Sequence, residues 1–371
     1  MKIIFVSNAL KVGGAEKFLL NIINGFAARG YQPVLFILDD DNPLMPVLDK
    51  SIKTYIFKKK FRYDIGISLK IRRAILREKA TKVICIEIYP FFLSKLLFQF
   101  NNKIKFYISL HNSLPIHKKQ HIFDIAYLKV FRKPDTAIFI CNYQKDCFRK
   151  KYNFNPFKSV VIYNGIDTHF FSSSSANNEI SPELFRWKEK IGLPEISKTI
   201  LMIGRLSREK AHIFAFEALS LLNKQLPVKA HLVIVGTGPD NFLKILQDKC
   251  RELGIENVVH FLGGSSEVRP YLLTADIFTL TSFSETFSIA ALEAMSCGIP
   301  CSLTRVGGAP EMIVNDQIGV LSETRNPESI ADSWNTLLSR SMSREYISNY
   351  TASHFSLDKM MNEYISLIGQ S

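Results

Sequence analysis

Short apolar runs rich in β-branched residues recur along the whole chain, and a helical pattern separates each run from the next. In the first half they occur at residues 2–6, 33–38, 82–88, 104–110, 136–140 and 160–163. In the second half they occur at residues 199–203, 230–235, 258–261, 277–280 and 300–303. Continuous apolar strands that alternate with helices are typical of a parallel sheet covered on both faces. The sequence therefore predicts an α/β chain with two Rossmann-like domains in series.

A polar segment divides the chain into two halves. Asn164-Gly165-Ile166-Asp167 is followed by residues 172–178, which are mostly serine and asparagine and cannot form part of a core. Near the end, a break around residues 353–356 precedes an amphipathic helix whose apolar residues are Leu357, Met360, Met361, Tyr364 and Ile365. Ligands of such sheets bind beyond the carboxyl ends of the strands, so we expect the functional site in the cleft between the domains.

The composition indicates a folded chain that spans no membrane. Its 371 residues, 47% of them hydrophobic, suffice for two ordinary domains and exclude a disordered or fibrous protein. No charge-free apolar run approaches the roughly 18–20 residues of a spanning helix, and a strand begins almost at Met1, without a signal-peptide pattern. Six scattered cysteines without a Cys-x-x-Cys pair indicate buried thiols. We therefore expect a cytoplasmic protein.

The positive charge is concentrated in the first half. Residues 1–165 contain 29 lysines and arginines against 11 aspartates and glutamates, a charge of +18, whereas residues 166–371 contain 18 against 23, a charge of −5. The basic segments 58–62, 70–82, 118–119 and 149–151 occur together with the apolar residues Tyr55, Phe57, Phe61, Tyr63, Ile71, Ile75 and Leu76. This pattern favours an anionic membrane surface over a merely solvated basic face. A nucleic-acid partner is not expected, because no recognition helix, zinc finger or RNA-binding signature is present.

Two glycine-containing loops occur where a predicted strand passes into a helix. Gly13-Gly14-Ala15-Glu16 follows the first strand, and its glycines would let the backbone and the helix N-terminus approach an anion. Residues 204–210, Gly-Arg-Leu-Ser-Arg-Glu-Lys, follow the first strand of the second half and place Arg205 and Lys210 where they could bind a diphosphate. Each loop alone would also fit an ordinary turn or a surface charge cluster.

Two further motifs bear on cofactors. Gly236-Thr237-Gly238-Pro239 is only half of a dinucleotide-binding motif, and its missing third glycine argues against a nicotinamide cofactor. Asp39-Asp40-Asp41 matches an Asp-x-Asp metal motif by letter, but it follows a strand of the first half, whereas the candidate diphosphate-binding residues Arg205 and Lys210 lie in the second half. We interpret it as a solvated loop and expect no metal ion.

Residues 282–300 carry the strongest local signal. Glu285 lies in the loop after a strand, and Glu293 follows eight residues later, inside a helix. The small residues Ser288 and Ala290 would let this helix begin close to a ligand. Its N–H groups could then bind phosphate while the two carboxylates accept hydrogen bonds from sugar hydroxyls. Alone, the segment would equally fit a capping Glu285 and an exposed Glu293.

Together these motifs resemble those of the retaining glycosyltransferases of family four, which have the GT-B fold. The resemblance covers nearly the whole chain and rests on ordered motifs at residues 13–16, 164–167, 204–210, 236–239, 261–263, 275–276, 285–293 and 306–311. It implies two Rossmann-like domains facing across a deep cleft. Residues 1–165 with 352–371 would form the acceptor-binding domain and residues 166–351 the donor-binding domain, with the C-terminal helix crossing back to the first.

The resemblance also implies roles for individual residues. Arg205 and Lys210 would bind the donor diphosphate, Glu285 the hydroxyls of the transferred sugar, and Glu293 the ribose. His111, at the end of a strand, matches the family's histidine beside the donor sugar. The expected catalytic set is His111, Arg205, Lys210 and Glu285. The other donor-binding residues are Gly14, Gly236, Gly238, Leu262, Phe287, Ser288 and Ile289.

The implied reaction is front-face transfer with retention. The acceptor hydroxyl attacks on the side from which the nucleotide leaves, and a donor phosphate oxygen takes its proton. No cofactor or metal is implied, because Arg205 and Lys210 would offset the diphosphate charge. Two residues depart from the family pattern: Ala211 replaces a frequent glycine or asparagine, which could alter how the loop approaches phosphate, and Ser288 replaces a frequent glycine at a position that tolerates small residues.

The resemblance predicts transfer of a hexose or N-acetylhexosamine from a nucleotide-diphosphate sugar, with UDP-sugars favoured over GDP-sugars. The acceptor would be a saccharide or a lipid-linked molecule in bacterial-type surface polysaccharide or lipopolysaccharide synthesis. Since the +18 half is the acceptor domain, we expect peripheral binding to the inner face of the cell membrane. The alternatives are another GT-B enzyme of sugar nucleotides, such as a hydrolysing epimerase, and a non-catalytic sugar-nucleotide-binding subunit.

Overall fold

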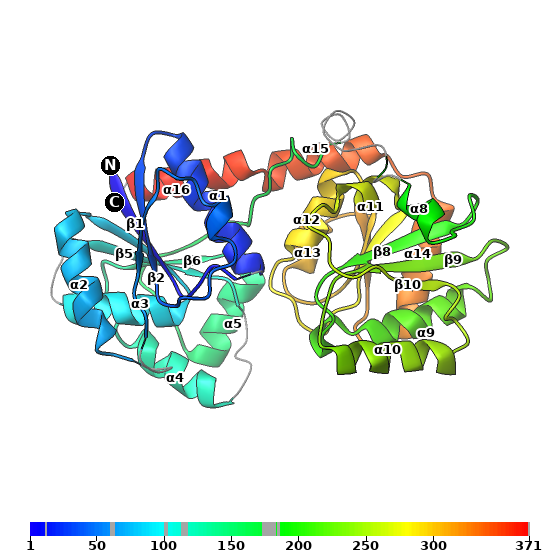
Figure 1. Ribbon diagram of the computed structural model, residues 1–371, viewed down its shortest axis with the longest axis horizontal. Coiled ribbons are helices and arrows are strands. Elements are labelled where there is room, and N and C mark those ends of the chain that lie inside the picture. The colour runs from blue at the N-terminus through cyan, green and yellow to red at the C-terminus, as the bar shows by residue number, and fades with distance from the viewer. Residues whose placement is uncertain are drawn as a thin grey trace. The chain divides into compact units, whose positions relative to one another are not determined.

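The computed structural model describes residues 1–11, 13–59, 64–99, 103–112, 118–172, 183 and 186–369. Its contacts divide the chain into two compact units. The first unit consists of Met1–Gly165 and Leu357–Ser371, and the second unit consists of Ile166–Ser356. Each unit is a parallel sheet flanked by helices (Figure 1). The predicted α/β class with two Rossmann-like domains is therefore confirmed.

The first unit contains a seven-stranded sheet in the order β3-β2-β1-β4-β5-β6-β7, with every neighbouring pair parallel. Its strands are β1 (Lys2–Ser7), β2 (Gln32–Ile37), β3 (Lys53–Ile56), β4 (Lys82–Ile86), β5 (Lys105–Leu110), β6 (Thr136–Phe139) and β7 (Ser159–Val161). Its helices include α1 (Gly14–Ala28), α2 (Ile67–Glu78), α3 (Ile88–Lys95), α4 (Lys118–Leu128), α5 (Asn142–Tyr152) and α16 (Leu357–Gly369), with the 3-10 turns η1 (Met45–Val47) and η2 (Leu96–Phe98).

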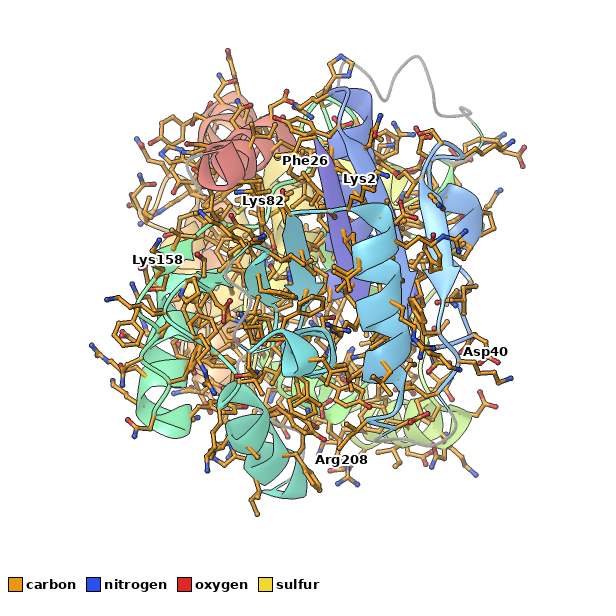
Figure 2. The ribbon with its side chains drawn as sticks, turned by 90° about the vertical axis from the view of Figure 1, so that its left-hand side faces the viewer. Lys2, Phe26, Asp40, Lys82, Lys158 and Arg208 are labelled. Carbon is orange, nitrogen blue, oxygen red and sulfur yellow. The ribbon has the colours of Figure 1, made fainter. Side chains whose placement is uncertain are left out.

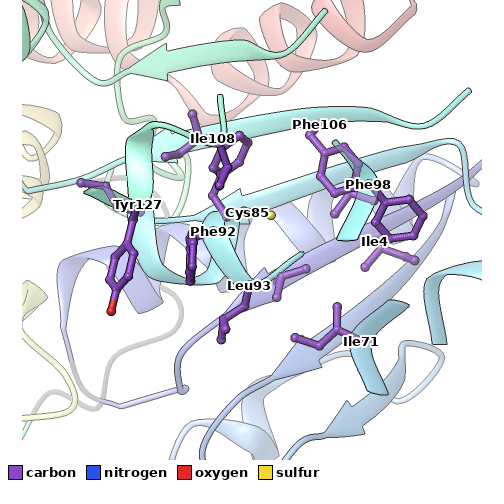
Figure 3. Close-up of a cluster of buried hydrophobic side chains, with 14 of the residues drawn as sticks. Ile4, Ile71, Cys85, Phe92, Leu93, Phe98, Phe106, Ile108 and Tyr127 are labelled. Carbon is purple, nitrogen blue, oxygen red and sulfur yellow. The ribbon is translucent and has the colours of Figure 1, made fainter. Parts of the chain in front are cut away.

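Each face of this sheet has its own apolar core. Side chains alternate along a strand, so Ile4 of β1 packs in one core while Phe5 packs in the other. Figure 3 shows the first core, in which Ile71 of α2 and Phe92 of α3 lie with Ile4 over one face of the sheet. The second core contains residues of α1 and α16. Burial on both faces explains why the strands read as continuous apolar runs.

The second unit repeats this plan with a six-stranded parallel sheet in the order β10-β9-β8-β11-β12-β13. Its strands are β8 (Lys198–Ile203), β9 (Ala230–Val235), β10 (Val259–Phe261), β11 (Ile277–Leu280), β12 (Cys301–Thr304) and β13 (Gly319–Ser322). Its helices include α8 (Trp187–Lys190), α9 (His212–Leu222), α10 (Asp240–Glu252), α11 (Arg269–Thr274), α12 (Ile289–Ser296), α13 (Ala309–Met312), α14 (Pro327–Ser339) and α15 (Arg344–Phe355), with the 3-10 turn η3 (Arg208–Lys210).

Two strands, β3 and β13, were not predicted from the sequence. Each lies at the edge of its sheet. Both ends of β3, Lys53 and Ile56, are exposed, and β13 is only partly buried in its middle. An edge strand pairs on one side only and need not be apolar on both faces, so neither segment shows the continuous apolar pattern of the central strands.

The C-terminal segment returns to the first unit at Leu357 rather than at residue 352. Helix α15 belongs to the second unit, where the Ser348 hydroxyl donates to the Ser296 carbonyl at 2.8 Å and the Phe355 ring packs on that of Phe287. Helix α16 packs on α1 in the first unit. The chain therefore changes units at Ser356, between two helices.

The apolar residues among the basic segments are mostly core residues, which corrects the interpretation of them as membrane anchors. Ile71 and Ile75 are fully buried, and Tyr55 and Phe57 pack against the same core. In the stretch 55–76, α2 is thus an amphipathic helix with a basic outer face. Figure 2 shows nitrogen-tipped side chains, among them Lys158, projecting from the first unit. Phe61 and Tyr63, with residues 60 and 62, lie outside the described residues, as do 173–178 of the predicted linker.

Two other expectations can be compared with the structure. All six cysteines are buried and unpaired, as predicted. Within the described ranges, no helix has both the length and the apolar character needed to cross a membrane.

Candidate active site

In the second unit, the strand order reverses between β8 and β11, and the loops that follow these two strands contain the predicted donor-binding residues. The loop after β8 leads through η3 to Lys210, and the loop after β11 leads through Glu285 to α12. A reversal of strand order leaves a crevice at the carboxyl edge of a parallel sheet, which is where ligands of such sheets bind. The predicted residues therefore lie at the expected edge.

Lys210 and Glu285 form an ion pair at this edge. The Lys210 Nζ lies 2.6 Å from the Glu285 Oε2, and the Ser282 hydroxyl donates to the same oxygen at 3.3 Å. The two side chains are 21% and 24% exposed, so both can be reached from solvent. The Thr281 hydroxyl, which lies 3.2 Å from the Lys210 carbonyl, ties the two loops together. The structure thus joins the predicted diphosphate-binding lysine to the predicted sugar-binding glutamate.

Glycines allow the surrounding loops to pack backbone against backbone. A Cβ atom on Gly236 would lie 1.8 Å from the Gly204 carbonyl oxygen, and one on Gly238 would lie 2.4 Å from that of Leu206. Gly307 has a φ of 59°, and a Cβ there would lie 1.9 Å from the Glu285 carbonyl oxygen. Larger residues at these positions would push the loops apart. The glycines therefore allow the loops that contain Lys210 and Glu285 to pack closely against their neighbours.

Helix α12 begins immediately after Glu285. Ser288 caps it, because its hydroxyl accepts from the Ala291 N–H at 3.3 Å, and both Ser288 and Phe287 are buried. Ile289 is the first helical residue, so the positive end of the helix dipole lies in this loop. Glu293 lies further along α12 and is 4% exposed. The exposed Glu293 of the alternative interpretation is therefore wrong.

The other predicted donor residues are near this edge but do not join the ion pair. Arg205 follows β8 and is exposed, and among the described residues no ion pair holds it. Leu262 follows β10 and is partly exposed; its N–H donates to the Ile234 carbonyl at 2.9 Å.

Asp40 and Asp41 of the first unit pair with Lys58 and Lys11 and are mostly exposed, consistent with a solvated loop.

In the first unit, the strand order reverses between β1 and β4. Gly14 is the first residue of α1, in the connection that follows β1. The preceding Gly13 is crowded, since a Cβ there would lie 2.5 Å from a Glu16 carboxylate oxygen. The N-terminus of α1 therefore lies at the carboxyl edge of this sheet, as the sequence predicts.

His111 follows β5 at the same edge of the first unit. It is 7% exposed, and its ring packs on Phe18 with 4.1 Å between ring centroids. Its Nε2 lies 3.0 Å from the Ser109 hydroxyl, which lies 3.0 Å from the hydroxyl of Tyr364 on α16. Burial lowers the pKa of His111 to about 3, so the ring is neutral at physiological pH.

Glu87, which belongs to none of the sequence motifs, binds the backbone at His111. Its Oε1 accepts hydrogen bonds from the N–H groups of His111 at 3.0 Å and Asn112 at 3.1 Å, and from the Asn112 side chain at 2.9 Å. Its backbone has φ 77° and ψ 168°, a region that is strained by about 1–3 kcal/mol for residues other than glycine. Burial raises the pKa of Glu87 to about 8. The available sequence signal was a single carboxylate directly after β4, whose residues 83–86 are all apolar.

Comparison with known proteins identifies the class to which this fold belongs. Within that class, a solved Anabaena structure, Alr3699/HepE in complex with UDP, superposes with a TM-score of 0.84 at 19% identity and covers 100% of both chains. The fold is that of the GT-B glycosyltransferases, as predicted. The sequence model "Glycosyl transferases group 1" matches residues 185–354, and "Glycosyltransferase Family 4" matches residues 12–170. Both models describe glycosyltransferases, one for each half of the chain, so the chain belongs to the glycosyltransferases of these families.

Curated relatives match mainly over part of their length. An uncharacterized glycosyltransferase of Methanocaldococcus jannaschii, MJ1607, is 34% identical over 52% of this chain and 48% of its own. The N-acetyl-alpha-D-glucosaminyl L-malate synthase of Bacillus anthracis is 33% identical over 48% of this chain and 44% of its own. The chain therefore matches about half the length of these two relatives.

Proposed function

We propose that this chain is a retaining hexosyltransferase that moves a hexose or N-acetylhexosamine from a UDP-sugar. The acceptor is a saccharide or lipid-linked molecule in bacterial-type surface polysaccharide or lipopolysaccharide synthesis. The observation that carries the proposal is the Lys210–Glu285 pair at the β8–β11 reversal. It puts a cation for the diphosphate beside a carboxylate for sugar hydroxyls. The UDP complex of the Anabaena protein supports a uridine donor.

The residues would act mainly through electrostatics. Lys210 and Arg205 offset the negative charge that grows on the leaving diphosphate, without the help of a metal ion. Glu285 orients the sugar through its hydroxyls, and Glu293 binds the ribose. A donor phosphate oxygen takes the proton of the attacking hydroxyl, so no protein base is required. Because His111 is neutral, it offers the sugar a hydrogen bond rather than a charge.

Thermal unfolding with nucleotides tests this function. We expect UDP and UDP-sugars to raise the Tm without added metal, and GDP or ADP to have little effect. A ligand at 100 times its Kd stabilises the folded state by about 2.7 kcal/mol. A rise only with GDP would contradict the uridine assignment, and a rise only with added Mg²⁺ would contradict metal independence. No rise with any nucleotide would contradict donor binding as proposed.

Product analysis distinguishes the alternative activities. Incubation with the donor and an acceptor should release UDP and form a glycoside with the donor's anomeric configuration, which NMR coupling constants report. An inverted product would contradict retention. Free epimerised sugar would indicate a hydrolysing epimerase, and nucleotide binding without turnover would indicate a non-catalytic subunit.

We also propose that the first unit binds the anionic inner face of the cell membrane through the outer face of α2. Leu69, Arg73 and Leu76 follow one another at i, i+4 and i+7 on this helix, and all three are exposed. Lys70 and Arg77 lie beside them and are also exposed. Exposed leucines among basic residues are better suited to contact with a lipid surface than to contact with water. Although Ile71 and Ile75 belong to the core, the exposed face of α2 can therefore still bind a membrane.

Vesicle binding tests this surface. We expect sedimentation with phosphatidylserine vesicles at low salt, no sedimentation with neutral vesicles, and release at high salt. Replacing Arg73 and Arg77 with glutamine should weaken binding about thirtyfold, at about 1 kcal/mol for each residue. The matched control replaces Lys244 and Arg251, two exposed basic residues on α10 of the second unit, with glutamine. Binding that is unchanged by salt, or equally reduced in the control, would contradict the proposal.

A further inference from the structure

Three buried polar groups form a chain from the C-terminal helix to His111. Tyr364 on α16 and Ser109 on β5 are fully buried, and the Ser109 hydroxyl oxygen lies 3.0 Å from both the Tyr364 hydroxyl and the His111 Nε2. The residues come from distant parts of the sequence, since Ser109 and Tyr364 are 255 positions apart. This hydrogen-bonded chain therefore exists only because α16 packs within the first unit.

Counting hydrogens along this chain selects one arrangement. The neutral His111 ring carries one hydrogen, on either Nδ1 or Nε2. If Nε2 carried it and donated to Ser109, the Ser109 hydrogen would turn to Tyr364. The Tyr364 hydrogen would then be without a partner among the described residues. A buried hydroxyl hydrogen without an acceptor is unfavourable.

The opposite direction gives both buried hydroxyl hydrogens an acceptor, and only the His111 ring hydrogen has no partner among the described residues. Tyr364 donates to the Ser109 oxygen, Ser109 donates to the His111 Nε2, and the His111 hydrogen is on Nδ1. Donation from Tyr364 also polarises the Ser109 hydroxyl and strengthens its own donation to His111. The third possibility, in which Tyr364 and His111 both donate to Ser109, leaves the Ser109 hydrogen without a partner among the described residues.

We propose that Ser109, oriented by Tyr364 of α16, fixes His111 in the tautomer that carries its hydrogen on Nδ1. His111 then faces its ligand as a hydrogen-bond donor only, because its acceptor nitrogen is occupied by Ser109. Ser109 and Tyr364 are positioning residues that act through His111. In the proposed reaction, which this inference presupposes for its kinetic consequence, His111 donates to a sugar oxygen. Helix α16 thereby contributes to the site through Tyr364.

Nitrogen-15 NMR of histidine-labelled protein tests the tautomer directly. The shifts of Nδ1 and Nε2 distinguish the protonated nitrogen from the bare one, and a His111→Gln variant assigns the signal among the eight histidines. We expect Nδ1–H in the unmodified chain. Ser109→Ala should give a mixture of both tautomers. Tyr364→Phe, which keeps the ring, should retain Nδ1–H but move the Nε2 shift toward that of a weaker hydrogen bond. An Nε2–H form in the unmodified chain, or no spectral change in Ser109→Ala, would overturn the proposal.

Kinetics give the second measurement. We expect kcat to fall about tenfold in Ser109→Ala and about threefold in Tyr364→Phe, and the double variant to lose no more than Ser109→Ala alone, because Tyr364 acts through Ser109. Ser68→Ala is the matched control, since Ser68 is a buried serine of the same unit whose hydroxyl has no partner in the described part of the chain. Additive losses would overturn the proposal. If the protein showed no transferase activity while the Nδ1–H result held, the proposed function would fail and the tautomer assignment would stand.

Discussion

Replacing Lys210 with alanine is expected to lower kcat/KM for the nucleotide sugar by about 10²–10³-fold, the usual effect of removing one electrostatic group that stabilises a transition state. The lysine is well placed for this role, because its ammonium lies 2.6 Å from Glu285 at the carboxyl edge of the sheet. Both side chains are about one-fifth to one-quarter exposed, so a ligand can reach them. The rise in Tm with UDP should also become much smaller, because the diphosphate loses one of its two positive partners. Steady-state kinetics and thermal unfolding measure the two effects.

The control for this variant is Lys249→Ala. Lys249 also forms a 2.7 Å ion pair, with Glu252 on α10, and is 21% exposed like Lys210. Its replacement should leave kcat/KM and the UDP effect unchanged. Glu285→Gln separates the two members of the site, since it keeps a hydrogen-bond acceptor for the sugar and removes the charge that holds Lys210. Wild-type kinetics and an unchanged UDP effect in Lys210→Ala would contradict the role assigned to this lysine.

The central strands of both sheets could be predicted from the sequence because they are buried on both faces. Burial on both faces produces a run of apolar residues, as at residues 83–86 of β4 and 232–235 of β9, every one of which is buried. The edge strands β3 and β13 could not be found in this way, because part of each faces water. The return of the chain at Leu357 was also misplaced, since α15 and α16 are both helical and only their packing partners differ.

The positions of the proposed donor-binding residues could be predicted because short motifs contain them. Lys210 and Glu285 stand in loops that directly follow strands, so the order of strands and loops already places both at one edge of the sheet. The support of His111 could not be predicted. Glu87 reaches it across 24 positions and Tyr364 from the other end of the chain, and no local pattern records such contacts. The strained backbone of Glu87 is likewise visible only in three dimensions.

In the basic first half, the sequence pattern alone did not separate membrane-binding residues from core residues. Interleaved basic and apolar residues describe both a membrane-binding segment and an ordinary amphipathic helix with a basic outer face. In α2 the period of the apolar residues separates the two: Ile71 and Ile75 face the core, whereas Leu69 and Leu76 share the outer face with Arg73. Only the second group can contact a membrane, so the testable surface is smaller than the sequence suggests.

A large loss of stability is expected when Asp135 is replaced by alanine. The Lys95 Nζ lies 2.8 Å from the Asp135 Oδ1, and the two side chains are 1% and 0% exposed. The other Asp135 oxygen accepts from the Arg132 N–H at 2.7 Å. Removing the carboxylate leaves a buried ammonium without its counter-charge, which typically costs about 3–5 kcal/mol. The free energy of unfolding of the first unit should fall by this amount in urea titrations.

The two tryptophans make this measurement specific to one unit. Trp187 and Trp334 both belong to the second unit, so tryptophan fluorescence follows that unit while circular dichroism follows both. In Asp135→Ala we expect the circular dichroism transition to move to lower urea. The matched control is Asp146→Ala, which breaks an exposed ion pair with Arg149 in the same unit and should cost less than about 1 kcal/mol. Replacing Lys95 with methionine and Asp135 with leucine together should recover most of the loss, because no buried charge then remains. An unchanged transition in Asp135→Ala would show that the buried pair does not hold α3 to the sheet as the structure indicates.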